Sequence, residues 1–191
     1  MLTEISKKYE FILGSTSPRR KQILTDLGLT FKVKQQEVEE VFPNDLSGKA
    51  IAEYLAKLKA DAYTLNNNQI VITGDTIVVQ QGNVLGKPKS DNEAKQMLAA
   101  LSGNKHEVIS AICLKSNQKT IVLSDCTQVY FNPLTATEIA YYISNYQPFD
   151  KAGAYGIQEW IGQIGIHKIE GSFYTVMGMP IHLLYQALKT F

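Results

Sequence analysis

The stretch that decides the fold begins as an apolar run and ends as the start of a helix; it reads Tyr9-Glu10-Phe11-Ile12-Leu13-Gly14-Ser15-Thr16-Ser17-Pro18-Arg19-Arg20. The run from Tyr9 to Leu13 predicts a strand. Ser17 followed by Pro18 is typical of a helix N-cap and of the first helical position. Apolar residues at helical spacing then predict a helix that continues to Leu27, where Gly28 ends it.

This helix start carries groups that suit an anion. The first backbone N–H groups of a helix have no partner within it, and the helix dipole is positive at that end. Ser15 and Thr16 add hydroxyls, and Arg19 and Arg20 add planar paired donors that match phosphate oxygens. The stretch therefore predicts a site for a phosphorylated small molecule, although Ser-Pro helix starts with solvated arginines are also common in purely structural roles.

The rest of the chain narrows the class of protein. Its 191 residues suffice for one sizeable core or two closely joined lobes. A net charge of +1 gives no global field for nucleic acid or for an anionic membrane, and no apolar run has the length of a membrane span. No signal-peptide pattern opens the chain. Cys113 and Cys126 lie in apolar runs and are expected to be two reduced, buried thiols on neighbouring strands, which fits the cytoplasm.

Strands and helices are interleaved along the chain. Strands are predicted at 31–34, at 69–73 with 76–80 extended, and at 106–115, 120–131 and 164–169. Helices are predicted at 48–65, 90–101, 135–145 and 180–188. Capping boxes, Ser90 with Glu93 and Thr135 with Glu138, open two of these helices. The expected class is α/β with α+β character; the central hairpin argues against a purely parallel sheet.

Carboxylates mark two further places. Glu37, Glu39 and Glu40 form an acidic patch that is either a solvated loop or a source of ligands for a hard divalent cation. Asp75 follows an apolar strand at Gly74. It is expected at a strand end, where ligands bind in open sheets, and a role as a plain turn residue is the alternative.

Three other features carry open alternatives. Lys87 lies in Gly86-Lys87-Pro88, a rigid turn that holds a lysine outward. Lys59 lies on an amphipathic helix, where a solvated lysine is the ordinary interpretation. The loop around Gly153, Gly156 and Gln158 is either thin enough to approach a base and read its edge or a plain connection.

Taken together, the motifs resemble one family, the Maf nucleotide pyrophosphatases, also called septum-formation inhibitor Maf-like proteins. The resemblance runs from Phe11 to about Leu188. The motifs are residues 14–20, Val38-Glu39-Glu40, Leu58-Lys59-Ala60, residues 74–78, Gly86-Lys87-Pro88, Leu101-Ser102-Gly103, residues 150–158, Glu170-Gly171-Ser172 and residues 176–180.

The resemblance implies an activity, a set of residue roles and an architecture. The activity is hydrolysis of a nucleoside triphosphate to the monophosphate and pyrophosphate, and Ser-Pro-Arg-Arg with a Gly-Ile-Gln loop is similar to the branch that acts on dTTP and UTP. The implied catalytic base is Asp75, the residues associated with substrate choice are Arg19, Thr76 and Gln158, and the remaining active-site set is Ser15, Arg20, Glu40, Lys59 and Lys87. The architecture is a single Maf-like domain over 1–191, an elongated mixed sheet in two lobes with a central cleft.

The implied partners follow from the same reasoning. A divalent metal, Mg²⁺ or Mn²⁺, is expected on Glu40 and Asp75, and a homodimer is implied by the resemblance. Nucleic acid and membrane are not expected as partners. Two alternatives remain: a pyrophosphatase for modified or non-standard nucleotides, resembling the inosine-triphosphatase group, and a non-catalytic nucleotide-binding regulator of cell division. A pure binder of polyanions gains nothing from carboxylates near the phosphates, which argues against the second.

Overall fold

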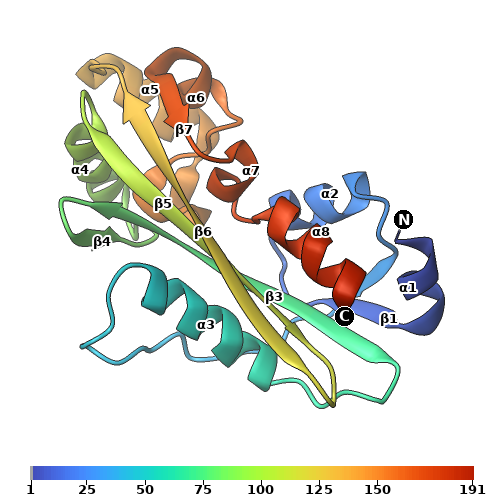
Figure 1. Ribbon diagram of the computed structural model, residues 1–191. Coiled ribbons are helices and arrows are strands. Elements are labelled where there is room, and N and C mark those ends of the chain that lie inside the picture. Colours follow the sequence, from blue (N-terminus) through green and yellow to red (C-terminus); the bar gives the residue numbers. More distant parts are fainter. Residues whose placement is uncertain (1) are drawn as a thin grey trace. The chain divides into compact units, whose positions relative to one another are not determined.

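The computed structural model describes residues 2–191, and the chain forms two compact units. The first unit takes residues up to Asp75, Ser110–Asp125 and Gly178–Phe191; the second takes Thr76–Ile109 and Cys126–Met177. Figure 1 labels most of the helices and strands. Whether the two units act as the single domain expected from the sequence stays a prediction.

The first unit contains the helix start that opened the sequence. β1 (Glu10–Leu13) pairs in parallel with β2 (Phe31–Val33) and with β3 (Gln69–Gln80), whose residues up to Asp75 belong to this unit. Its helices are α1 (Thr3–Lys8), α2 (Pro18–Asp26), α3 (Lys49–Asp61) and α8 (Ile181–Thr190). The buried core of this unit is built from β1, from the first part of β3 and from the apolar faces of α2 and α3.

The second unit holds most of the remaining elements. Its strands and strand segments come from β3, β4 (Asn83–Leu85), β5 (Lys105–Lys115), β6 (Thr120–Phe131) and β7 (Ile166–Glu170). Its helices are α4 (Asp91–Leu101), α5 (Ala136–Tyr146), the short turns η1 (Pro148–Asp150) and η2 (Ala152–Ala154), α6 (Trp160–Gly165) and α7 (Phe173–Val176). A separate apolar core in this unit gathers side chains of α4, α5, α6, β5 and β6.

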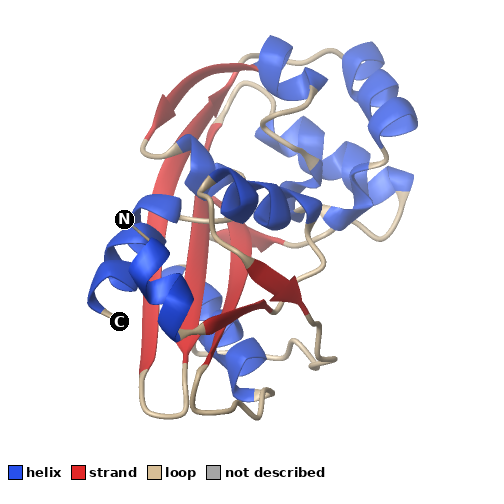
Figure 2. Cartoon of the chain, turned by 90° about the vertical axis from the view of Figure 1, so that its right-hand side faces the viewer, coloured by secondary structure: helices blue, strands red, loops and turns tan. Residues whose placement is uncertain are grey.

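The sheet is mixed, as the sequence predicts. Its strand order is β2-β1-β3-β5-β6-β7, with β4 paired to β3. β1 pairs in parallel with both its neighbours, whereas β4 on β3 and β7 on β6 are antiparallel. Strands and helices can be followed by colour in Figure 2.

In the described part of the chain, 2–191, no helix combines the length and apolar character needed to cross a membrane.

The structure corrects several expected boundaries. β3 is one continuous strand over 69–80, so Asp75 lies within it rather than at a strand end or in a turn. α3 ends at Asp61 rather than near residue 65. The expected strand at 164–169 is divided between the last turn of α6 and β7. The short elements α1, β4, α6 and α7 were not predicted, because a helix of four to six residues or a three-residue strand carries too little periodicity.

The two predicted capping boxes differ. The Thr135 hydroxyl accepts the backbone N–H of Glu138, and the Glu138 carboxylate accepts the backbone N–H of Thr135, which is a complete box. The Ser90 hydroxyl accepts the backbone N–H of Glu93, but the Glu93 carboxylate accepts the backbone N–H of Lys89 rather than that of Ser90.

The cysteines lie on adjacent strands as thiols, as expected. Cys113 is buried, whereas Cys126 is exposed, so the prediction that both are buried was wrong for Cys126.

Candidate active site

The start of α2 has the expected capped geometry. The Ser17 hydroxyl accepts the backbone N–H of Arg20, and the Ser15 hydroxyl accepts the backbone N–H of Ser17 at 3.2 Å. The Arg20 guanidinium donates through Nη1 to the Ser15 hydroxyl at 3.4 Å and through Nε to the carbonyl of Gly178 at 2.9 Å. Two sequence-predicted residues, Ser15 and Arg20, are therefore joined directly, and α2 begins with a fixed cation beside its N-terminus.

Arg20 also lies against the strand that carries Asp75. A Cβ placed on Gly74 would come within 3.5 Å of the Arg20 guanidinium carbon and 2.9 Å of the Ala111 carbonyl oxygen. Gly74 therefore leaves room for the guanidinium against β3. Loss of hydration lowers the pKa of Arg20, while the charges of Asp75 and Glu40 act to raise it. Arginine stays protonated regardless, so this cation faces both carboxylates.

Lys59 joins the two predicted metal ligands. Its Nζ lies 2.6 Å from Oδ1 of Asp75 and 3.0 Å from Oε1 of Glu40. The Lys59 side chain is 17% exposed and that of Asp75 11%, whereas Glu40 is 46% exposed. The ordinary interpretation of Lys59 as a solvated helix lysine was therefore wrong. Glu37 and Glu39 lie exposed in the same loop.

Helix α3 is held in register with β3 at this point. The Thr73 hydroxyl donates to the Ala56 carbonyl at 2.6 Å, and both residues are buried. One helical turn further along α3, Lys59 reaches Asp75 two residues further along β3. Because β-strand side chains alternate, Thr73 and Asp75 point to the same face of the sheet, which is the face that α3 covers.

The structure separates the predicted residues into two groups. Ser15, Arg20, Glu40, Lys59 and Asp75 form the cluster just described in the first unit. Arg19, on the first turn of α2, is half-buried, and its charge opposes protonation of Arg20. Thr76, Lys87 and Gln158 belong to the second unit.

Lys87 is exposed in the loop that follows β4. The backbone N–H of Gly153 donates to the carbonyl of Gly86 at 3.0 Å, which ties this loop to the segment that leads to Gln158. Gly153 has a φ of +70°, a value that glycine adopts without strain, and a Cβ there would press on Val78 at 3.1 Å.

Gln158 projects from an otherwise buried segment. Residues 153–157 are buried, and Gln158 is exposed. The backbone N–H of Glu159 donates to the carbonyl of Gly156 at 3.0 Å, which closes a four-residue turn with Gln158 at its third position. Tyr142 and Lys151 contact Glu159, the last residue of this turn. No site role was predicted for these three residues, because a tyrosine at helical spacing indicates only a core residue.

The cluster in the first unit also bears on metal binding. In the described range, 2–191, there is no group of three or more His, Cys, Asp or Glu side chains that could hold an ion by themselves. Glu40 and Asp75 nevertheless bind the same cationic group, the Lys59 ammonium, so their oxygens converge. Magnesium is commonly held by one or two carboxylates together with substrate phosphates, and two converging carboxylates fit that mode.

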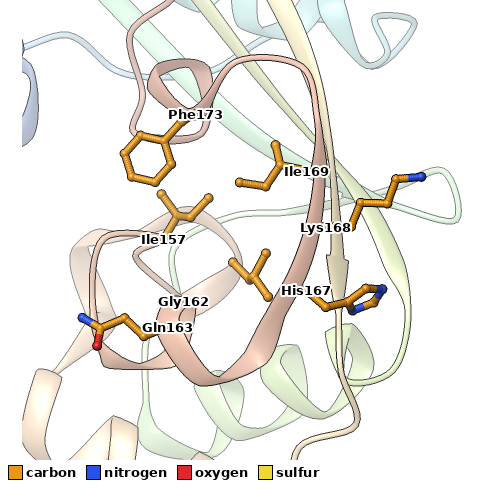
Figure 3. A pocket seen from close by; sticks show the side chains of 8 residues that line it. Ile157, Gly162, Gln163, His167, Lys168, Ile169 and Phe173 are labelled. Carbon is orange, nitrogen blue, oxygen red and sulfur yellow. The ribbon is translucent and has the colours of Figure 1, made fainter.

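A pocket of about 300 Å³ lies elsewhere in the second unit. Figure 3 shows its apolar side chains, among them Ile157, Ile169 and Phe173, while His167 and Lys168 point away from these. The residues that line it are Ile157, Gly162, Gln163, Ile166, His167, Lys168, Ile169 and Phe173. No residue predicted for the active site lines this pocket.

Comparison with known proteins yields close relatives in sequence. A family profile described as Maf-like protein matches residues 10–191. The dTTP/UTP pyrophosphatase of Christiangramia forsetii is 48% identical over 191 residues, covering 99% of this chain and 97% of the relative. The dTTP/UTP pyrophosphatase of Flavobacterium johnsoniae is 47% identical over 192 residues, covering 100% of this chain and 99% of the relative.

Solved structures share the fold at low sequence identity. The Staphylococcus aureus Ham1 protein superposes with a TM-score of 0.51 and 20% identity, covering 95% of this chain and 98% of that one. A HAM1 protein from Coxiella burnetii gives a TM-score of 0.51 and 15% identity, covering 96% and 100%. These two similarities concern the fold alone.

Proposed function

Because this chain belongs to the family of Maf-like proteins, we propose that it hydrolyses dTTP and UTP to dTMP and UMP with release of pyrophosphate. The observation that carries the proposal is the pair of carboxylates joined by Lys59 beside the cationic start of α2. Relatives with the same printed activity cover nearly the whole chain, which supports the substrate class.

The start of α2 binds the triphosphate. Its backbone N–H groups, the Ser15 hydroxyl and the Arg20 guanidinium are donors fixed in place before the substrate arrives. Preorganised donors stabilise charge as it develops, since they need not reorient during the reaction. The charge that accumulates on departing pyrophosphate is stabilised in the same way, and Lys87 adds a further cation by resemblance to the family.

Asp75 is the proposed base. It accepts a proton from the water that attacks the α-phosphorus, while the bond from that phosphorus to the bridging oxygen breaks and pyrophosphate leaves. The hydrogen bond from Lys59 to Oδ1 holds the carboxylate in one orientation, as a general base requires. Because Asp75 lies within the continuous strand β3, its backbone is held in place as well.

Glu40 and Asp75 are the residues that would hold a divalent cation. Such an ion neutralises phosphate charge and acidifies bound water. Glu40 is the more exposed of the two and can turn toward an ion brought in on the triphosphate. Lys59, which now joins both carboxylates, would then keep its contact with Asp75 or move to a phosphate oxygen.

Base selection is assigned to Gln158, with Arg19 and Thr76 associated by family resemblance. A uracil or thymine edge offers two carbonyl acceptors and one N–H donor, and a glutamine amide supplies both a donor and an acceptor to such an edge. Cytosine replaces one carbonyl by an amino group and loses the N–H. A buried mismatch of this kind costs about 1–3 kcal/mol per unsatisfied group, so UTP and dTTP should be preferred to CTP.

Product analysis tests the reaction. Purified protein with Mg²⁺ or Mn²⁺ and UTP should yield UMP and one pyrophosphate per turnover, separated by ion-exchange chromatography. Orthophosphate with UDP would place attack at the γ-phosphorus and contradict the proposal. A parallel panel of ITP and 7-methyl-GTP tests the alternative of non-standard nucleotides, and CTP tests the base preference. Substrate binding without turnover would favour a regulator.

A further inference from the structure

The hydroxyl of Tyr142 binds both ends of the turn that carries Gln158. It accepts the backbone N–H of Gly156 at 3.0 Å and donates to Oε2 of Glu159. The same two residues close the turn by their own backbone hydrogen bond at 3.0 Å. A single side-chain atom therefore links the first and the fourth residue of the turn, with Ile157 and Gln158 between them.

The far side of Glu159 is fixed by a buried cation. The Lys151 Nζ lies 3.2 Å from Oε1 of Glu159 and 2.7 Å from Oδ1 of Asp150. The Lys151 side chain is 9% exposed and that of Glu159 19%. Each oxygen of the Glu159 carboxylate thus has its own partner, Tyr142 on one and Lys151 on the other, and its orientation is set from two sides.

The carboxylate lies so close to the turn that a side chain at residue 156 would displace it. A Cβ on Gly156 would lie 2.8 Å from the carboxylate carbon of Glu159 and 3.0 Å from Nε2 of Gln158. The Gln158 amide and the Glu159 carboxylate therefore both fold over Gly156. A shift of the turn moves the Gln158 amide with it.

Tyr142 itself is anchored in rigid surroundings. Its side chain is fully buried in the core of the second unit and stacks on Tyr146, with ring centroids 5.0 Å apart and an interplanar angle of 24°. It belongs to α5, whose N-terminus carries the complete capping box. Burial and the contact with Glu159 raise the pKa of Tyr142, so its hydroxyl keeps its proton and remains a donor.

We propose that Tyr142 is a positioning residue for base selection: its hydroxyl clamps the turn 156–159 and so fixes the Gln158 amide that reads the base. This inference rests on the proposed function, in which Gln158 meets the base. It goes beyond that function in naming the buried Tyr142–Glu159–Lys151 network as the determinant of where Gln158 lies.

The test compares two buried tyrosines of the same core. Tyr142→Phe removes the clamp and keeps the ring. Tyr155→Phe is the matched control, because the Tyr155 hydroxyl contacts His106 at 2.7 Å and no residue of the turn. For each protein, kcat and KM are measured with UTP and with CTP, together with the melting temperature.

In Tyr142→Phe we expect the ratio of kcat/KM for UTP to that for CTP to fall by about 2- to 30-fold, the range typical of residues that act through another residue. The loss should fall on UTP while CTP hydrolysis persists. Tyr155→Phe should keep the wild-type ratio even if its melting temperature falls as far. Amide hydrogen exchange at 156–159 should accelerate in Tyr142→Phe and not in Tyr155→Phe.

A second pair of variants covers the case in which Tyr142→Phe fails to fold. Glu159→Gln retains an oxygen that accepts from Tyr142 and should keep most of the UTP preference, whereas Glu159→Ala should lose it. If the ratio of kcat/KM for UTP to that for CTP is the same in these two variants, the proposed role of Tyr142 is wrong.

Gln158→Ala separates the inference from the function on which it rests. If Gln158→Ala lowers the ratio and Tyr142→Phe does not, Tyr142 is only a core residue and the inference is wrong. If Gln158→Ala leaves the ratio unchanged, the base-reading role of Gln158 fails and takes the inference with it. If both lower the ratio, the double variant should fall no further than Gln158→Ala alone.

Discussion

The contact between Asp75 and Lys59 changes the interpretation of both residues, because a plain turn residue and a solvated lysine were the ordinary interpretations. A carboxylate and a lysine in a sequence are most often solvated, but here the ammonium lies 2.6 Å from the carboxylate in a mostly buried pair. Removing charges from water costs free energy, so a mostly buried pair is weak evidence of a contribution to stability. The proposed role of Lys59 is to hold the Asp75 carboxylate in place as a base.

Replacing Asp75 by Asn tests that role. The variant keeps the size and a hydrogen-bond acceptor but removes the basicity, so turnover with UTP should fall at least about 10²-fold. The melting temperature should change little, because Lys59 keeps its contact with Glu40. Steady-state kinetics and thermal unfolding measure the two effects.

Asp61→Asn is the control for this experiment. Asp61 is also an aspartate paired with lysines, Lys57 and Lys115, at the end of α3. Its loss should leave turnover near the wild-type value. Near-normal turnover in Asp75→Asn would show that the assignment of the base is wrong.

Among the elements, α5 combines a strong local signal with a role in the turn that carries Gln158. The complete capping box of Thr135 and Glu138 satisfies backbone donors at the N-terminus of the helix. Tyr142 lies two turns further along the same helix.

Thr135→Ala should therefore destabilise the protein by about 1 kcal/mol, within the usual range of 0.5–2 kcal/mol for the loss of a cap. Urea denaturation measures the change. Ser144→Ala, at an exposed position of the same helix, is the control and should alter the free energy of unfolding by less than about 0.5 kcal/mol. Equal effects of the two substitutions would contradict a specific contribution of the cap.

At the scale of the whole molecule, a buried histidine couples stability to pH. His106 is 2% exposed, contacts the Tyr155 hydroxyl through Nε2, and has no hydrogen-bond partner at Nδ1 among the described residues. Burial lowers the pKa of His106 from 6.5 to about 4. The folded protein therefore keeps this imidazole neutral over a range in which the unfolded chain takes up a proton.

The sign of the effect follows from that difference in proton uptake. Well above pH 6.5 His106 is neutral in both states and its contribution to stability is constant. As the pH falls toward about 4, the unfolded state gains a proton that the folded state does not, so the free energy of unfolding decreases, by about 3 kcal/mol at most. Below about pH 4 both states are protonated and this loss stops growing.

Urea denaturation between pH 4 and pH 7 measures this dependence. In His106→Gln the decrease should be smaller than in the wild type, because glutamine can accept from Tyr155 and does not titrate. His167→Gln, at an exposed position, should leave the pH dependence as it is. An unchanged slope in His106→Gln would mean that His106 does not determine it.

Elements whose signals are local could be predicted from the sequence. The strand and the capped start of α2, the hairpin of β5 and β6, and the complete capping box of α5 all follow from hydrophobic period and cap chemistry within a few residues. The mixed sheet and the family follow from the order of these motifs. The cationic start of α2 could be predicted in the same way, because its cap and its arginines lie within a few residues of one another. That it binds phosphate stays a prediction.

Which charges meet depends on long-range packing and could not be predicted from the sequence. Lys59 and Asp75 are 16 residues apart, and nothing in an amphipathic helix indicates which lysine will face a carboxylate of β3. The sequence also did not indicate that β3 continues through Gly74, because a glycine beside an aspartate is typical of a turn. In the structure this glycine leaves room for the Arg20 guanidinium against the strand. Tyr142 and Glu159 meet only because α5 and the turn before α6 share one core, and long-range packing of this kind leaves no periodic trace in the chain.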